Sequence, residues 1–199
     1  MQTSSERARC TLDGLSVGDA FGERAFTAVE FVARRTLPEG MWRWTDDTAM
    51  AVSIVETLEA HGTIDQDDLA QRFAARFARE PNRGYGGGAV ELLEAIGAGG
   101  AWREQAGALF DGQGSYGNGA AMRVAPVGAW FATEPEVAAD QARRSAAVTH
   151  AHVEAREGAA AIALTTAWLW MPSPPAADEI LGNLVGALAP CETRERIAA

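Results

Sequence analysis

The stretch from Trp44 to Met50 contains two adjacent carboxylates, Asp46 and Asp47, beside the hydroxyl of Thr45. Adjacent anions repel each other, and the positive end of a helix dipole offsets only about 0.3–1 kcal/mol per charge. A divalent cation such as Mg²⁺ offsets far more of the repulsion and prefers oxygen ligands of this kind. The simpler alternative is an N-cap threonine followed by an acidic first helical turn, which is common. Taken alone the motif fits that helix start, but the motifs that follow favour a metal site.

A second chemical motif is the glycine-rich run from Gly114 to Arg123. It is predicted to be a turn that leads directly into a helix, where free N–H groups and the helix dipole suit a pyrophosphate. Asn118 is expected either to cap that helix or to bind the ligand. Arg123, expected about one turn inside the helix, would pair with a phosphate or with a structural carboxylate.

The third motif places His150 and His152 between two predicted helices. Two histidines at this spacing can bind a metal ion, but no third nitrogen or thiolate ligand lies nearby in the sequence, which argues against zinc. A ring that contacts a ligand, or one that caps a helix, fits better. His61 lies near a predicted helix end and is interpreted as structural.

The spacing of apolar residues follows a helical period along most of the chain. Alanine, leucine, glutamate and arginine fill these segments, as helix propensity favours, and alternating β-branched strands are absent. The sequence therefore predicts an all-α fold. The predicted helices cover residues 5–20, 46–61, 66–79, 86–97, 101–109, 118–132, 135–148, 153–171 and 177–189.

Glycine is concentrated in three predicted connections, at residues 18–22, 83–88 and 112–119. Glycine permits positive φ and close backbone approach. Each connection alone is typical of a loop that ends a helix. Three such loops, each followed by a helix, indicate a shared binding rim.

The bulk composition excludes several classes of protein. The chain has 199 residues, enough for one domain with a real core, and a formal net charge of −10. All of its basic residues are arginines, and the negative balance argues against general nucleic-acid or anionic-membrane binding. Cys10 and Cys191 lie far apart, and no signal core or membrane-length apolar run is visible. These features predict a soluble cytoplasmic protein with reduced thiols.

Taken together and in this order, five motifs resemble the ADP-ribosylglycohydrolase family, over about residues 12–169. The motifs are Gly18–Gly22, Trp44–Thr48, Arg83–Gly86, Ser115–Arg123 and Thr149–His150. The resemblance implies a compact orthogonal bundle of helices with a dinuclear Mg²⁺ (or Mn²⁺) site. It also implies an enzyme that removes ADP-ribose from modified side chains or related conjugates. The motifs are most similar to the branch that cleaves O-linked ADP-ribose.

Carried over residue by residue, the resemblance assigns Thr45, Asp46 and Asp47 to the metal site. His150 would contact the ligand, and Arg123 would brace the loop or touch phosphate. Asp19 would orient the first helix and its loop. The diphosphate and ribose pocket would be lined by Gly114, Ser115, Tyr116, Gly117, Asn118 and Gly119, with Met122 nearby.

The chain departs from the family pattern at two places. Where the family has a glutamate that closes over the ligand, this chain has Phe26, and Glu23 is the nearest candidate to act as a third catalytic acid beside Asp46 and Asp47. The second metal motif of the family, an Asp-x-Asp-Thr-like run near the C-terminus, is absent from these residues. We therefore expect residues 1–199 to be a single domain that is incomplete at its C-terminus, lacks the family's C-terminal helices and supplies half of the dinuclear site.

Two functions are compatible with the motifs, and a third is disfavoured by them. The first is an ADP-ribosyl hydrolase that acts on ADP-ribose or an ADP-ribosylated protein, with cleavage through an oxocarbenium-like transition state. The second is a non-catalytic module that binds ADP-ribose without the metal centre. The third, an isoprenoid-type synthase, requires a further acid three residues after the paired aspartates, and that position is Met50. The sequence leaves the oligomeric state open.

Overall fold

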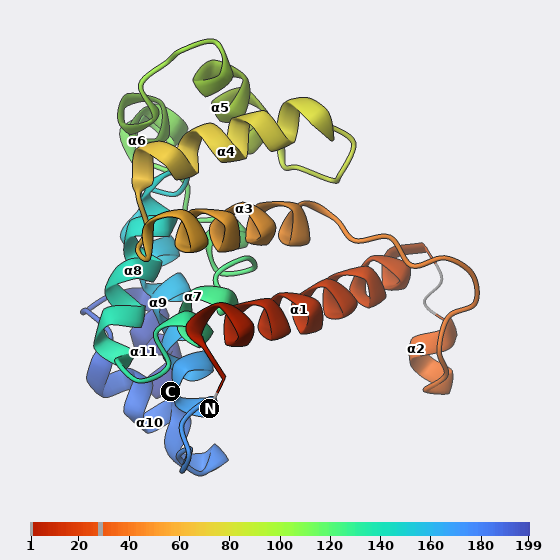
Figure 1. Ribbon diagram of the computed structural model, residues 1–199, viewed down its shortest axis with the longest axis vertical. Coiled ribbons are helices and arrows are strands. Elements are labelled where there is room, and N and C mark those ends of the chain that lie inside the picture. The colour runs from red at the N-terminus through yellow and green to blue at the C-terminus, as the bar shows by residue number, and fades with distance from the viewer. Residues whose placement is uncertain (1, 28–29) are drawn as a thin grey trace.

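The computed structural model describes residues 2–27 and 30–199, and this part of the chain folds into helices without a β-strand (Figure 1). The prediction of an all-α fold is therefore confirmed. A short 3-10 helix, η1 (Asn118–Ala120), precedes α7. The α-helices are α1 (Ser4–Thr27), α2 (Glu30–Arg34), α3 (Asp46–His61), α4 (Gln66–Arg79), α5 (Gly87–Gly97), α6 (Trp102–Gly112), α7 (Ala125–Trp130), α8 (Pro135–Ala147), α9 (Val153–Leu169), α10 (Ala177–Ala187) and α11 (Glu192–Ala198).

The main core holds α3 in place. Helix α4 supplies Leu69, Phe73 and Phe77, spaced four residues apart so that all three lie on one face. Helix α3 contributes Ile54 and Leu58, both fully buried, to the same cluster. Burying each such side chain stabilises the fold by about 1.5–3 kcal/mol. The packing therefore fixes α3 along its length and, with it, the two acids at its first turn.

Helices α8 and α9 form the most extensive helix pair, and small side chains dominate their contact. Alanine at every fourth position keeps one face of each helix narrow, which lets the two axes approach closely. The connection between them, which carries His150, is consequently held against the core. The buried alanines are Ala138, Ala142 and Ala146 in α8 and Ala155, Ala159, Ala163 and Ala167 in α9.

Helix α1 corrects one prediction. The sequence predicts that this helix ends at residue 20 and that 18–22 forms a loop, whereas the helix continues to Thr27 with both Gly18 and Gly22 inside it. Each internal glycine costs about 1 kcal/mol. Tertiary contacts outweigh that cost: Asp19 accepts hydrogen bonds from the start of α3, and the ring of Phe21 packs against Phe31 of α2. In Figure 1, α1 runs beside α3 and α2 stands away from the rest of the molecule.

The prediction of a single helix over 118–132 is also wrong. The structure has η1 and then α7, separated by the turn that contains Arg123. Pro126 explains the break, because it has no N–H to donate and is tolerated only in the first turn of a helix, where α7 places it. The short helices α2 and α11 are absent from the prediction, since five to seven residues carry too little periodicity to be recognised.

A smaller hydrophobic cluster at the C-terminal end packs α10 against α9 through Leu184 and Leu188.

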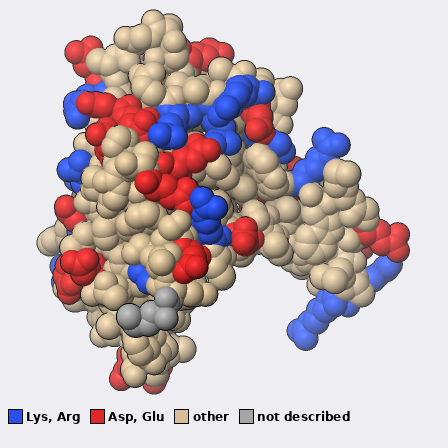
Figure 2. Space-filling model, viewed as in Figure 1, with Lys and Arg blue, Asp and Glu red and all other residues tan. Residues whose placement is uncertain are grey.

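On the face shown in Figure 2, acidic and basic side chains are interleaved. Ion pairs such as Arg9 with Glu59 at 2.6 Å and Arg76 with Glu56 at 2.7 Å join neighbouring helices. No helix within residues 2–27 and 30–199 is both long and apolar enough to span a membrane.

Candidate functional site

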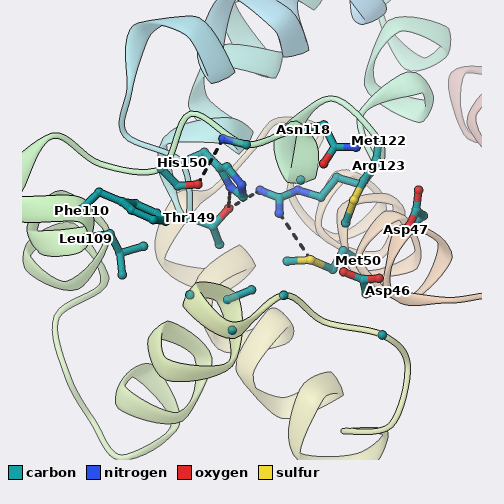
Figure 3. Close-up of a pocket in the computed structure, with 18 residues that line it drawn as sticks. Asp46, Asp47, Met50, Leu109, Phe110, Asn118, Met122, Arg123, Thr149 and His150 are labelled. Carbon is teal, nitrogen blue, oxygen red and sulfur yellow. Dashed lines mark hydrogen bonds between the residues drawn. The ribbon is translucent and has the colours of Figure 1, made fainter.

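A cavity of about 470 Å³ lies between the start of α3, the loop before α5, the end of α6 and the loop before η1 (Figure 3). In the figure, Asp46 and Asp47 lie at one end and Leu109 and Phe110 at the other. Most residues predicted for the site meet here, from segments far apart in the chain. They are Asp46, Asp47, Ser115, Gly117, Asn118, Gly119, Met122, Arg123 and His150.

The first turn of α3 is capped by a residue of another helix. Thr45 is the N-cap, but its side chain does not bond to the backbone of its own helix. Instead one carboxylate oxygen of Asp19, on α1, accepts from the backbone N–H groups of Thr45 at 2.8 Å and Thr48 at 3.2 Å, and from the Thr48 hydroxyl at 2.6 Å. An oxygen acceptor at this place satisfies N–H groups that the helix leaves free. Asp19 thus orients the acidic turn.

A second contact holds the acidic turn from the opposite side. The N–H of Asp46 donates to the carbonyl of Arg83 at 2.7 Å. The Arg83 guanidinium lies 3.6 Å above the Trp44 ring and donates to the Trp44 carbonyl. Gly84 follows with a φ of +88°, and a Cβ there would lie 3.6 Å from the Asp46 carboxylate. The turn before α5 therefore borders the carboxylates directly.

Both carboxylates carry an electrostatic penalty. Burial, and then the negative charge of Asp47, raise the pKa of Asp46 to about 6, against an ordinary value of 3.8. Burial likewise raises the pKa of Asp47. A nearby cation relieves both effects, since it favours the charged form of each acid.

The donor types fit a hard divalent cation such as Mg²⁺, because carboxylate and hydroxyl oxygens are its usual protein ligands. The Thr45 hydroxyl lies 2.7 Å from Asp19 and 2.9 Å from Asp47. In residues 2–27 and 30–199, however, no group of three or more His, Cys, Asp or Glu side chains is arranged to hold an ion. Thr45, Asp46 and Asp47 therefore fit one side of a coordination shell.

A second cavity, of about 420 Å³, lies on the other side of Asp47. Its wall includes Glu23 and Phe26 of α1, together with Thr45 and Met122. Glu23 therefore lines this neighbouring cavity, together with Asp47, and not the main one. Of the residues predicted for the site, Asp47 and Met122 border both cavities.

Two glycines, Gly114 in the loop before η1 and Gly119 within η1, permit close packing. Gly114 has a φ of +76°, and a Cβ there would lie 2.8 Å from the Cβ of Ala151. A Cβ on Gly119 would lie 2.7 Å from the His150 ring. Both distances are too short for any other residue. Glycine at these positions therefore lets the loop lie against the segment that follows α8.

The loop does not provide the helix-terminus anion site that the sequence suggests. It leads into only three residues of 3-10 helix, so no long helix dipole points at the cavity. Ser115 and Gly117 face the cavity, while Tyr116 between them is 67% exposed and points outward, an alternation typical of extended backbone. The Tyr116 ring lies 6.3 Å from Phe110 and 5.9 Å from His152 between ring centroids. Tyr116 is thus beside the cavity and Gly114 is behind its wall.

Arg123 is fully buried and acts as a brace. Its guanidinium donates to the Thr149 hydroxyl at 2.8 Å and the Ser145 carbonyl at 3.2 Å, and it lies 4.5 Å over the Phe73 ring. Burial lowers its pKa to about 9, which leaves it charged at neutral pH. Contrary to prediction it lies in a turn and not inside a helix. Of its two predicted roles, these contacts favour bracing.

His150 is buried beside this arginine. Its Nδ1 lies 2.7 Å from the Thr149 hydroxyl. Burial and then the positive charge of Arg123 lower the pKa of His150 to about 3, so the ring is neutral at physiological pH. A neutral imidazole offers one N–H donor and one nitrogen acceptor.

Comparison with known proteins identifies the family. A family model described as ADP-ribosylglycohydrolase matches residues 1–199. The chain belongs to this family. An "ADP-ribosylhydrolase ARH3" of Xenopus tropicalis is 32% identical over 213 residues, covering 98% of this chain and 59% of the relative. The ARH3 of Homo sapiens is 38% identical over 152 residues, 75% of this chain and 41% of the relative. An uncharacterised protein of Archaeoglobus fulgidus is 30% identical over 174 residues.

This ADP-ribosylglycohydrolase family member thus spans about 40–60% of the length of these ARH3 relatives. Sequence reasoning missed several residues of its cavity wall, including Met50, Leu109 and Phe110. Met50 has the spacing of an ordinary core position on α3. Phe110 has a φ of +53°, rare for a non-glycine residue, and no sequence signal announces that conformation.

The other two histidines of this family member lie outside the cavity wall. His152 caps α9, because its Nδ1 accepts from the Glu154 N–H at 3.2 Å. His61 ends α3 and lies 3.4 Å from Asp68. His61 agrees with its structural interpretation, and His152 takes the helix-capping role, one of the two left open from the sequence.

Proposed function

We propose that the cavity binds ADP-ribose and that the protein hydrolyses the glycosidic bond between ADP-ribose and a modified side chain or related conjugate. The observation that carries the proposal is the pair of partly desolvated carboxylates at one end of a cavity of ligand size. The name ADP-ribosylhydrolase borne by the relatives supports the same reaction.

The cavity offers complementary surfaces along its length. The loop from Ser115 to Gly119 would follow the diphosphate and ribose, with His150 contacting the ligand. Phe110 lines the cavity and is 57% exposed, so it presents an aromatic face on which a base can stack. The anomeric carbon would then lie at the end that Asp46 and Asp47 occupy.

Hydrolysis requires a water molecule to give up a proton as its oxygen bonds to the anomeric carbon, while the departing oxygen is protonated. Asp46, Asp47 or Glu23 would accept the proton from water. The raised pKa of Asp46 suits a group that exchanges protons near neutral pH. Bound Mg²⁺ would orient the ribose hydroxyls and the water. The loop contacts, remote from the reacting bond, would supply binding energy that positions the sugar.

Several finer features belong to this proposal. The resemblance supports a dinuclear Mg²⁺ site, with Mn²⁺ as an alternative, and a preference for O-linked ADP-ribose. The resemblance supports ADP-ribose or an ADP-ribosylated protein as partner, and the net charge of −10 argues against nucleic acid or an anionic membrane. The unpaired cysteines Cys10 and Cys191 support a cytoplasmic location.

The test measures release of ADP-ribose from a serine-ADP-ribosylated peptide, with Mg²⁺ and with EDTA, for the 199-residue chain and for Asp46→Asn and Asp47→Asn. We expect Mg²⁺-dependent turnover that each substitution lowers at least about 100-fold, since removal of one group that stabilises a transition state has that size of effect. Turnover that is the same in EDTA, or unchanged in both variants, contradicts the proposal.

A second candidate function is a module that binds ADP-ribose without cleaving it. It is favoured by the finding that the described residues contain no cluster of three potential metal-binding side chains. Calorimetric titration with ADP-ribose separates the two functions. Tight binding of ADP-ribose that is the same with and without Mg²⁺, with no ADP-ribose released from a modified peptide, supports the binding module.

A further inference from the structure

Three polar side chains of the cavity wall, Arg123, Thr149 and His150, are joined in a chain of hydrogen bonds (Figure 3). Thr149 is 1% exposed and Arg123 is fully buried. Water therefore has little access to the two bonds, and their donors and acceptors must match within the protein.

The donor of each bond follows from the chemistry of the groups. Arginine has only donors, so the Thr149 oxygen accepts from Arg123. The Thr149 hydroxyl then has one hydrogen to place, and in the part of the chain that the structure describes its one acceptor within reach is Nδ1 of His150, at 2.7 Å. If Nδ1 carried a proton instead, the buried hydroxyl hydrogen would have no acceptor, which is costly.

We propose, building on the function proposed above, that Thr149 is a positioning residue: with Arg123 it holds His150 in the tautomer that carries its proton on Nε2. The ring then presents a neutral N–H donor to a phosphate or ribose oxygen of the ligand. Nε2 forms no hydrogen bond with any described residue, and it faces Gly117 and Gly119 of the cavity wall.

Gly119 keeps this edge of the ring in place. A Cβ at that position would lie 2.8 Å from Nε2, so any side chain would displace the imidazole from the cavity wall or from Thr149. The bond to Thr149 fixes one side of the ring and the contact with Gly119 limits the other. The orientation of the donor is thus set before a ligand arrives, which lowers the entropic cost of binding.

Nitrogen-15 NMR of the imidazole groups tests the tautomer directly. The chain has three histidines, and His150→Gln identifies the signals of His150. We expect, at pH 7 and without ligand, an acceptor-type Nδ1 and a protonated Nε2. A protonated Nδ1 in the wild-type protein overturns the proposal, whatever the result with ADP-ribose.

Substitution of Thr149 tests its role. Thr149→Val keeps the shape but removes the hydroxyl, and we expect a mixture of tautomers and about tenfold weaker binding of ADP-ribose, the effect of losing one directed hydrogen bond. Thr149→Ser should restore both properties. Ser145→Ala is the matched control, because the buried Ser145 hydroxyl has no partner among the described residues.

The outcomes separate this inference from the proposed function. An unchanged His150 spectrum in folded Thr149→Val, or a Thr149→Ser variant that behaves like Thr149→Val, contradicts the positioning role. If Thr149→Val does not fold, the wild-type spectrum and Thr149→Ser still decide. Failure of the wild-type chain to bind ADP-ribose contradicts the proposed function, while the tautomer is judged by the spectrum alone.

Discussion

Two regions of this protein hold carboxylates away from water with opposite electrostatics: one contains Glu157 alone, the other Asp46 and Asp47. Glu157, 4% exposed in α9, is bonded by Arg143 at 2.7 and 2.8 Å and by the N–H of Ala189 at 3.0 Å. Burial alone would raise its pKa, but these hydrogen bonds and the arginine charge outweigh burial and lower it. Among the described residues no cation is hydrogen-bonded to Asp46 or Asp47, and burial raises the pKa of both, although the charge of Arg123 partly opposes this at Asp46.

The difference separates a structural charge from one available for a ligand. The α8–α9 pair neutralises its own carboxylate and thereby joins the C-terminal helices to the core. The start of α3 holds two anions together by contacts to backbone and hydroxyl groups, leaving their charge uncompensated. A cation or a proton can stabilise the Asp46–Asp47 pair, whereas neither stabilises Glu157 further.

The largest effect is expected from Glu157→Ala. Removing the acid leaves Arg143 partly buried without its partner, and we expect a loss of about 3 kcal/mol in the free energy of unfolding, measured with urea. Glu192→Ala is the control, because Glu192 pairs with Arg196 at 2.6 Å on the surface, with side chains 62% and 79% exposed. Equal losses in the two variants would show that burial does not distinguish these pairs.

The next largest effect is expected from Asp19→Ala. It removes the acceptor for two N–H groups and two hydroxyls at the start of α3, and we expect a loss of about 2 kcal/mol of stability by the same measurement. Binding of Mg²⁺, followed by calorimetry, should weaken as the acidic turn loosens. Asp13→Ala, on an exposed part of α1, should change neither quantity. A stable Asp19→Ala protein with normal Mg²⁺ binding would refute the capping role.

Asp46→Asn should raise the free energy of unfolding, whereas the two preceding substitutions lower it. It removes one of two repelling anions, and we expect a gain of about 1 kcal/mol in stability for the metal-free protein at pH 7, since partial exposure screens the effect. The same substitution should weaken Mg²⁺ binding. A loss of stability in EDTA would mean that the Asp46 carboxylate is already compensated within the fold.

The pH dependence of that gain gives the smallest signal and the sharpest comparison. Because the pKa of Asp46 is raised to about 6, the folded protein keeps this proton in a range where the unfolded chain has released it, and stability falls as pH rises from about 4 to about 6. The gain in the free energy of unfolding from Asp46→Asn should therefore be near zero at about pH 4 and complete by about pH 7.

Glu157 behaves oppositely: its lowered pKa gives stability that is lost as pH falls. Urea unfolding of metal-free protein at several pH values measures both slopes. A gain that does not change with pH would exclude Asp46 as its source.

Prediction from sequence succeeded where local signals are strong. The bounds of α3 and α4 agree with the predicted 46–61 and 66–79, because Gly62 ends α3 with a φ of +69° and Asp65 caps α4 through two N–H groups. Prediction failed for α1, where tertiary contacts carry the helix through two glycines, and for 118–132, where Pro126 breaks it.

In the candidate site, too, some features could be predicted from the sequence and others could not. The paired acids, the glycine loop and His150 are recognisable as motifs and converge on one cavity, although their roles stay predictions. Tyr116 is exposed and does not line that cavity, and Glu23 borders another. Neither orientation can be read from residue type, since both depend on how the backbone turns.

The sequence by itself determined the helical class, the family and the chemical types present at the site, because periodicity, capping residues and ordered motifs are local properties. The tertiary structure decided which groups compensate one another. Only packing brings Asp19 to the start of α3, Arg143 to Glu157 and Arg123 to Thr149, across separations of 14 to 29 residues. Charge and hydrogen bonding act over a few ångströms, and those distances exist only after the chain has folded.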